Sequence, residues 1–81
     1  MVFEFTGSDE FVKNIVYLRK KYCLSRKAMG RLIGLSEYTI KYMEQEKFPL
    51  IISYDVLKRL RIVFDVTTEA LLHSYLDPDH H

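Results

Sequence analysis

Hydrophobic residues recur along the chain at the three- and four-residue intervals of helices. Met29 and Ile33 lie four residues apart and Ile40 and Met43 lie three apart, so each pair shares one helix face. The same spacing links further residues, namely Phe11, Ile15, Leu18 and Tyr22, and later Val56, Leu57, Leu60 and either Val63 or Phe64. The pattern predicts helices over about 9–22, 26–32, 36–45, 54–64 and 68–75. We therefore expect an all-α fold of five short helices around one core.

Each predicted helix follows a serine or threonine that can cap it. A hydroxyl at the N-cap accepts a hydrogen bond from a backbone N–H that has no partner within the helix. The candidate caps are Ser8, Ser25, Ser36, Ser53 and Thr67. Proline cannot continue a helix, so we expect the segment Asp77-Pro78-Asp79 to end the last one.

Two glycines mark the turn between the second and third helices. Gly34 is a natural end for the second helix, because a left-handed backbone there carries no Cβ penalty. Gly30 lies within that helix, where glycine costs about 1 kcal/mol relative to alanine, so we expect the third helix to cross close to it. The apolar spacing of the two helices, the turn at Gly34 and the small residue Gly30 together describe a helix-turn-helix. An ordinary helical hairpin in a small bundle is the alternative.

Two short apolar segments fall outside the predicted helices. Residues 1–7 alternate apolar and polar side chains, which favours a short edge strand or an arm. Such an arm would pack on the body of the domain or reach a symmetric partner. A frayed terminus is an equal alternative. The run Leu50 to Ile52 is expected to cover the core. The expected organisation is an N-terminal arm over 1–7, a helix-turn-helix domain over 8–76 and a tail over 77–81.

Composition narrows the class of protein. A chain of 81 residues forms one domain, and it buries only about 60–65% of its extended surface, so a second subunit would add stability. No apolar run approaches the length of a membrane span, and no signal-peptide pattern is present. Cys23 is the single cysteine, which excludes an internal disulfide and favours a packed, inert thiol in a cytoplasmic protein. His73, His80 and His81 show no metal-ligand spacing, so no metal or cofactor is expected.

Charge is distributed unevenly along the chain. The net charge is only +1, which argues weakly against a nucleic-acid partner. All twelve lysines and arginines, however, lie between Lys13 and Arg61 with four acidic residues, so that span carries a net charge of +8. This polarity suggests a basic face with acidic ends.

The segment from Leu18 to Leu72, about two thirds of the chain, resembles the Cro/repressor-type (lambda-repressor-like, XRE-type) helix-turn-helix DNA-binding family. The matching residues are Leu18-Arg19, Leu24-Ser25, Met29-Gly30, Ile33-Gly34-Leu35-Ser36, Thr39-Ile40 and Glu44, followed by Leu57, Leu60, Phe64-Asp65-Val66-Thr67 and Leu71-Leu72. Three positions depart from the family pattern. Cys23 replaces a frequent glycine, Arg26 replaces a frequent glutamine, and Glu44-Gln45-Glu46 replaces Glu-Asn-Gly.

The resemblance implies a five-helix domain that binds double-stranded DNA sequence-specifically as a repressor-type transcriptional regulator. The helix over residues 36–45 would enter the major groove, and its base-contacting residues would be Glu37, Tyr38, Lys41 and Tyr42. Phosphate contacts are expected from Arg26, Lys27, Ser36 and Lys47, and a structural ion pair between Arg19 and Glu44.

Elementary chemistry supports several of these roles. Lys41 can donate to guanine O6 and N7, and the N-terminus of the second helix favours an anion beside Arg26. Glu37 can accept from cytosine N4, or it serves only as a first-turn acid that stabilises the helix dipole.

A monomer of this size offers few base contacts, so a homodimer is expected, in a prokaryotic or phage-like context. No group of acid, base and nucleophile suggests an enzyme. The alternative function is a protein–protein interaction module that reuses the helix-turn-helix fold.

Overall fold

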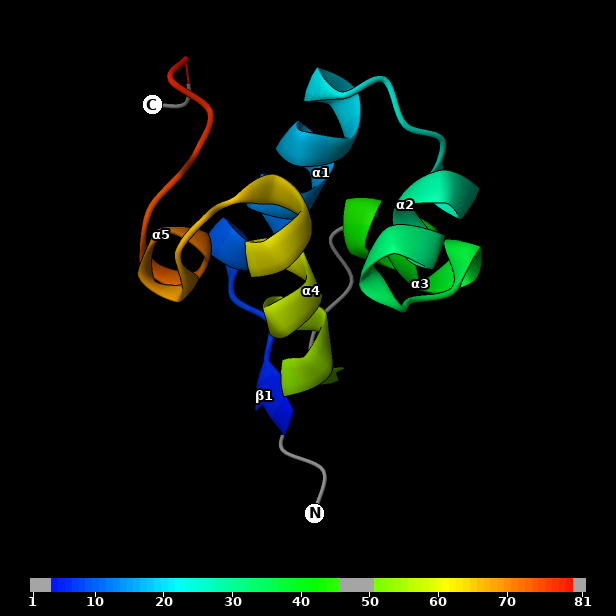
Figure 1. Ribbon diagram of the computed structural model, residues 1–81, viewed down its shortest axis with the longest axis horizontal. Coiled ribbons are helices and arrows are strands. Elements are labelled where there is room, and N and C mark those ends of the chain that lie inside the picture. The colour runs from blue at the N-terminus through cyan, green and yellow to red at the C-terminus, as the bar shows by residue number, and fades with distance from the viewer. Residues whose placement is uncertain (1–3, 46–50, 80–81) are drawn as a thin grey trace.

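A computed structural model of the chain describes residues 4–45 and 51–79. Within those ranges lie five helices and two short strands, arranged as in Figure 1. In chain order they are β1 (Glu4–Thr6), α1 (Asp9–Lys21), α2 (Arg26–Ile33), α3 (Glu37–Glu44), β2 (Ile51–Ser53), α4 (Tyr54–Phe64) and α5 (Thr68–His73). The expectation of a mostly helical small domain is therefore confirmed.

All five expected caps are present. The Ser25 hydroxyl accepts from the backbone N–H of Ala28 at 3.0 Å, and Ser36 accepts from that of Thr39 at 3.0 Å. The hydroxyls of Ser8, Ser53 and Thr67 cap α1, α4 and α5 in the same way. Each cap satisfies an N–H group that the helix leaves without a partner, so these residues set where the helices begin.

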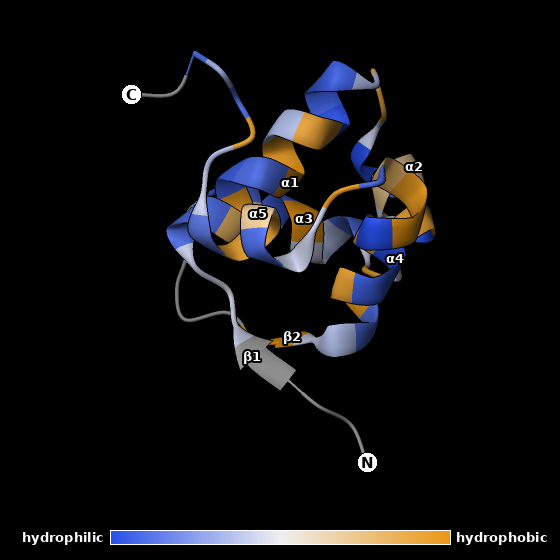
Figure 2. Ribbon diagram, turned by 60° about the vertical axis from the view of Figure 1, so that its left-hand side comes forward, coloured by the Kyte–Doolittle hydropathy of each residue, from blue (hydrophilic) through white to orange (hydrophobic). Residues whose placement is uncertain are grey.

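The core forms where the apolar stripes of the helices meet. Figure 2 shows hydrophobic residues interspersed with hydrophilic ones along the helices, as amphipathic packing requires. The buried core comprises Phe11, Val12, Ile15, Leu18, Met29, Ile33, Ile40, Met43, Ile52, Val56, Leu57, Leu60 and Leu71. Tyr22 was expected in this set, but it follows α1 as its C-cap and remains 50% exposed. The centroid of its ring instead lies 5.4 Å from that of Phe64. Of the two alternatives Val63 and Phe64, it is Phe64 that packs against the core.

A two-stranded antiparallel sheet joins the N-terminal segment to the middle of the chain. Phe5 of β1 stands opposite Ile52 of β2. Ile52 is buried, as expected for a residue that covers the core, whereas Ile51 is 57% exposed. Residues 1–3 of the expected arm lie outside the described residues. Over Glu4–Thr6 the structure contains the strand, and that strand pairs within its own chain.

The last helix ends earlier than expected. α5 stops at His73, well before Pro78, so the proline does not end it. The side chain of Asn14, in α1, does so instead: its Nδ2 donates to the carbonyls of Leu71 and Ser74 at 2.9 and 2.8 Å. Its Oδ1 accepts from the backbone N–H of Leu76 at 2.8 Å. Because a buried amide satisfies the last carbonyls of α5, the chain leaves the helix there and lies along α1.

Candidate nucleic-acid interface

The turn between α2 and α3 has the predicted glycine geometry. Gly34 adopts a left-handed backbone with φ of 80°, and its N–H donates to the carbonyl of Gly30 at 2.8 Å. Leu35 donates to the same carbonyl at 2.9 Å. A Cβ on Gly30 would collide with the carbonyl oxygen of Leu35. The backbone that approaches Gly30 is therefore the turn itself, and not the crossing third helix that we expected.

Cys23 differs from its expected role as a packed thiol. Its side chain is exposed, and its backbone is left-handed with φ of 55°. Leu24 follows it and donates its N–H to the carbonyl of Arg19 at 2.9 Å, which closes the turn from α1 into α2. A left-handed residue at this turn explains why a glycine would suit the position better than a residue with a side chain.

Glu44 connects α3 to both preceding helices. Its carboxylate accepts two hydrogen bonds from Arg19, with Nε at 2.9 Å and Nη2 at 3.1 Å, as the expected ion pair requires. Arg19 also donates to the carbonyl of Leu24 at 3.0 Å. Arg26 donates to the same Glu44 carboxylate through Nε and Nη2, at 3.2 and 3.1 Å. This second partner was not predictable from the sequence, because the two residues are eighteen positions apart on different helices.

Two opposing effects act on the pKa of the Glu44 carboxyl in this cluster. Partial burial raises the pKa of the Glu44 carboxyl, but the hydrogen bonds and positive charges of Arg26 and Arg19 outweigh that effect. The pKa of Glu44 therefore lies below its ordinary value, and the carboxylate is ionised at neutral pH. Arg26 remains 41% exposed along its side chain, so it stays accessible at the start of α2.

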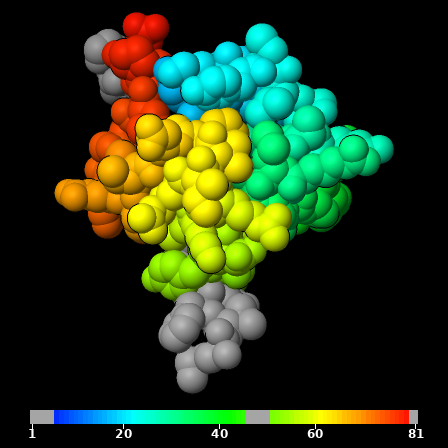
Figure 3. Space-filling view, viewed as in Figure 1, coloured from blue at the N-terminus to red at the C-terminus, as the bar shows by residue number. Residues whose placement is uncertain are grey.

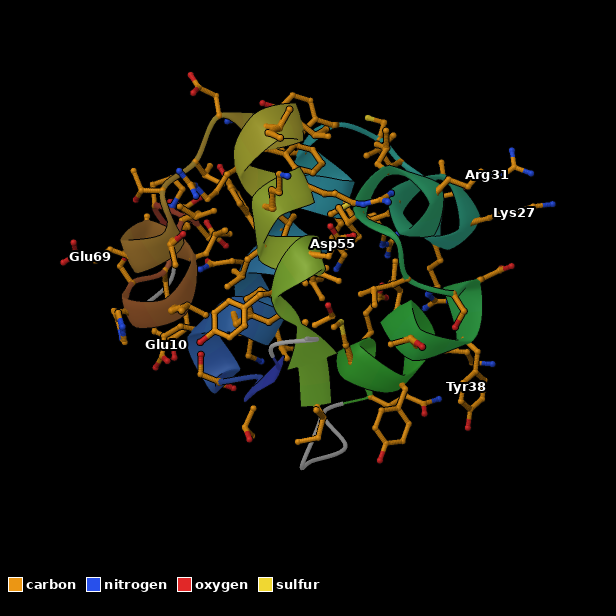
Figure 4. All side chains as sticks on the ribbon, turned by 60° about the horizontal axis from the view of Figure 1, so that its bottom comes forward. Glu10, Lys27, Arg31, Tyr38, Asp55 and Glu69 are labelled. Atoms are coloured by element: carbon orange, nitrogen blue, oxygen red, sulfur yellow. The ribbon has the colours of Figure 1, made fainter. Side chains whose placement is uncertain are left out.

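The outward face of α3 carries the four expected base-contacting residues. Glu37, Tyr38 and Lys41 are exposed, and Tyr42 is half-buried. The Tyr38 side chain is 74% exposed, and it points away from the body of the molecule in Figure 4. The rings of Tyr38 and Tyr42 stack with centroids 6.4 Å apart, which makes a flat aromatic surface one helical turn long.

Basic residues of α2 lie beside that face. Lys27 and Arg31 are both exposed, and Figure 4 shows them projecting to the same side of α2. Ser36 is exposed, but its hydroxyl is engaged with the backbone N–H and the hydroxyl of Thr39. Lys47, the remaining expected phosphate contact, lies outside the described residues.

One further basic residue reaches this region from α4. The guanidinium of Arg59 lies against Gly34, such that a Cβ added to the glycine would sit 3.4 Å from the Arg59 Cζ. Arg59 also pairs with Asp55 at 2.9 Å. This approach was not predictable from the sequence, because Arg59 and Gly34 are twenty-five positions apart and no periodicity connects them.

The described part of the chain holds no cluster of three or more His, Cys, Asp or Glu residues that would suit a metal ion. No helix in that part is long and apolar enough to cross a bilayer. Comparisons of the chain with models of protein families, with curated proteins and with solved structures found no match.

Proposed function

We propose that this protein is a lambda-repressor-like, repressor-type transcriptional regulator that binds double-stranded DNA sequence-specifically. The observation that carries the proposal is the turn at Gly30 and Gly34 between α2 and α3. The exposed Lys27 and Arg31 of α2 lie on the same side of the molecule as Tyr38 of α3 in Figure 4. A major groove about 12 Å wide accepts a single α-helix, and α3 is the helix whose outward side chains have base-reading chemistry.

Base recognition falls to the outward residues of α3. Lys41 donates to guanine, and the stacked Tyr38 and Tyr42 offer a flat apolar body to a thymine methyl and hydroxyls to a phosphate. Glu37 stands in the first turn of α3, where it accepts from cytosine N4 and repels phosphates at other sequences. A carboxylate at this position therefore increases selectivity at the expense of affinity.

Phosphate contacts surround the start of α2 and its exposed face. Lys27 and Arg31 are exposed cations one turn apart. Ser36 and Lys47 are the further residues proposed to contact phosphates. Arg26 contributes differently, since Glu44 neutralises part of its charge and fixes its orientation. Two copies of the protein on half-sites about 34–36 Å apart would supply enough base contacts for a selective site.

The experiment is a titration of a fluorescently labelled random-sequence duplex with the protein, followed by anisotropy at low and near-physiological salt. Affinity is expected to fall steeply with salt, because bound cations are released from the DNA phosphates. Lys41→Ala is expected to weaken binding. Lys20→Ala is the matched control, since Lys20 is an equally charged, exposed residue of α1, outside the two helices proposed to contact DNA.

The absence of binding at low salt would contradict the proposal, because the non-specific phosphate interaction does not need the right sequence. Equal weakening by Lys41→Ala and Lys20→Ala would contradict the assignment of α3 as the recognition helix. In the first case the protein–protein interaction module becomes the better hypothesis, since a stacked tyrosine pair at the surface is also typical of protein interfaces.

A further inference from the structure

A hollow of about 610 Å³ opens between α1, the end of α3 and the C-terminal segment. Val12, Asn14 and Met43 are buried residues of its lining. Tyr17 and Tyr75 also line it, and both are half-buried. Figure 3 shows the C-terminal segment, in red, beside α1, in blue, near the top of the view. The volume falls within the range of about 300–1,000 Å³ that is usual for sites of small organic ligands.

Hydrogen bonds hold both sides of this hollow in place. The Asn14 amide bonds the carbonyl of Ser74 and the N–H of Leu76, each at 2.8 Å, which fixes the C-terminal segment on α1. Glu44 lines the hollow from α3, and two arginines hold its carboxylate. The recess is therefore formed before a ligand arrives, so binding loses little free energy to ordering of the protein.

Positive charge gathers on the α1 side of the hollow. The cations are the lysines of one helix face, Lys13, Lys20 and Lys21. Within the described residues neither Lys20 nor Lys21 forms an ion pair. The lining also holds two carboxylates, but that of Glu44 is already bound to the arginines, which leaves Asp77 against three ammonium groups. The hollow therefore favours an anionic ligand.

An aromatic ring lies beside this charge. The Lys21 Nζ is 5.9 Å from the centroid of the Tyr17 ring, and Tyr17 packs against the core. A ligand ring that stacks on Tyr17 would therefore carry an attached anionic group within reach of the Lys21 ammonium. A phosphate suits this position better than a single carboxylate, because its three oxygens can accept from more than one lysine.

We propose that this hollow binds a small aromatic phosphate, of which a nucleoside monophosphate is the common form. Lys20 and Lys21 hold the phosphate, Tyr17 supports the ring, and Asp77 offers an acceptor to the N–H groups of a base. A role of the ligand in regulating DNA binding would rest on the proposed function, whereas ligand binding itself does not. The hollow is open to solvent, so the expected Kd is about 0.1–1 mM.

The test is a titration of the isotopically labelled full chain with adenosine monophosphate, followed by NMR chemical shifts of the backbone amides. The largest shifts are expected in the second half of α1 and over residues 75–77. Adenosine and inorganic phosphate each carry one part of the ligand, and each is expected to bind about tenfold or more weakly. Binding of either one as tight as that of adenosine monophosphate would overturn the assigned class of ligand.

Substitutions separate the two parts of the site. Lys20→Ala is expected to weaken adenosine monophosphate binding about fivefold, because it removes one exposed charged contact. Lys58→Ala is the matched control, since Lys58 is an exposed lysine of α4 outside the hollow, and it should leave the Kd unchanged. Tyr17→Leu keeps an apolar side chain against the core but removes the ring. It should weaken binding of the nucleotide severalfold and leave that of inorganic phosphate unchanged.

The absence of shifts at millimolar adenosine monophosphate would overturn the proposal. So would shifts confined to the exposed faces of α2 and α3, because the ligand would then occupy the proposed DNA contacts. Equal effects of Lys20→Ala and Lys58→Ala would overturn it as well, since they would indicate a diffuse attraction to positive charge. Because no DNA is present, ligand binding can fail while DNA binding holds, and the reverse outcome is equally distinguishable.

Discussion

Arg26 donates two hydrogen bonds to one oxygen of Glu44, although these residues stand at the start of α2 and the end of α3. The contact spans the helix-turn-helix and fixes the angle between its two helices. It also restrains Arg26, which we propose as a phosphate contact at the start of α2. Arg26 therefore contributes both to the stability of the fold and to the proposed phosphate contact. Replacing Glu44 instead of Arg26 separates the two roles, because the arginine stays in place.

Replacing Glu44 by glutamine is expected to lower the free energy of unfolding by about 1–3 kcal/mol at neutral pH, because two guanidinium groups lose their shared anion at a mostly buried site. Equilibrium urea denaturation measures the change. Glu37→Gln is the control, since Glu37 is exposed and its interaction with the helix dipole is worth less than about 1 kcal/mol. Equal losses for the two variants would show that the cluster contributes nothing beyond helix electrostatics.

The same carboxylate gives the fold a defined acid sensitivity. The pKa of Glu44 is lower in the folded protein than its ordinary value of 4.5, so the folded state binds fewer protons than the unfolded state. Its contribution to stability is complete above that value and is lost as pH falls through the lowered pKa of the folded state. We expect urea denaturation at successive pH values to show a difference in the free energy of unfolding between wild type and Glu44→Gln. This difference should become smaller as the pH falls. A constant difference would contradict the depressed pKa.

The buried amide of Asn14 is expected to be necessary for the C-terminal part of the fold. Asn14→Ala leaves the carbonyls of Leu71 and Ser74 and the N–H of Leu76 without their partner, at an expected cost of about 2–4 kcal/mol. Hydrogen exchange gives the local measurement, because the amide of Leu76 should exchange much faster in the variant. Unchanged protection of Leu76 would mean that water replaces the lost side chain without consequence.

Local patterns in the sequence predicted much of the helical framework. Local sequence was enough to predict the caps at Ser25 and Ser36 and the left-handed Gly34, because each depends on residues within four positions of one another. The ion pair of Arg19 and Glu44 is present in the structure, but it was expected only from the resemblance to a family. The resemblance itself stays a prediction.

Contacts between distant residues were not predictable in this way. Asn14 was unremarkable in the sequence, because its partners lie 56 to 62 positions away and nothing local requires an amide in α1. Arg26 was assigned to phosphate alone, since periodicity shows which face a residue occupies and not what lies opposite it. Cys23 was expected to be packed because free cysteine is a small apolar residue, but the left-handed turn holds it at the surface.

That turn predicts a stabilising substitution. Cys23→Gly removes the steric cost of a left-handed backbone, partly offset by the greater flexibility of glycine in the unfolded chain, for an expected net gain of about 0.5–1 kcal/mol. Urea denaturation under reducing conditions measures it. Cys23→Ala is the matched control, because it removes the thiol but keeps the Cβ, and it should give no such gain. An equal gain from alanine would attribute the effect to the thiol rather than to the backbone.

The link between the C-terminal segment and the start of α1 can be followed through the ionisation of one tyrosine. The Tyr75 hydroxyl donates to a carboxylate oxygen of Asp9 at 2.6 Å, and this hydrogen bond raises the pKa of Tyr75 to about 12. Tyr75 should therefore form tyrosinate clearly above the ordinary pKa of 10.0 in an ultraviolet absorbance titration. Tyr75→Phe should abolish that late phase, and Asp9→Asn should move it toward the ordinary value.

The sign of the effect on stability follows from the same shift. Because the folded-state pKa of Tyr75 is raised, its hydrogen bond to Asp9 stabilises the protein fully below pH 10.0 and is lost as pH rises towards 12. Over that window wild type should lose more stability than Tyr75→Phe, which has no proton to release there. The comparison of the two proteins by urea denaturation across this range isolates the contact, since other alkaline effects act on both. Parallel curves for wild type and Tyr75→Phe would show that the C-terminal segment does not depend on the contact with Asp9.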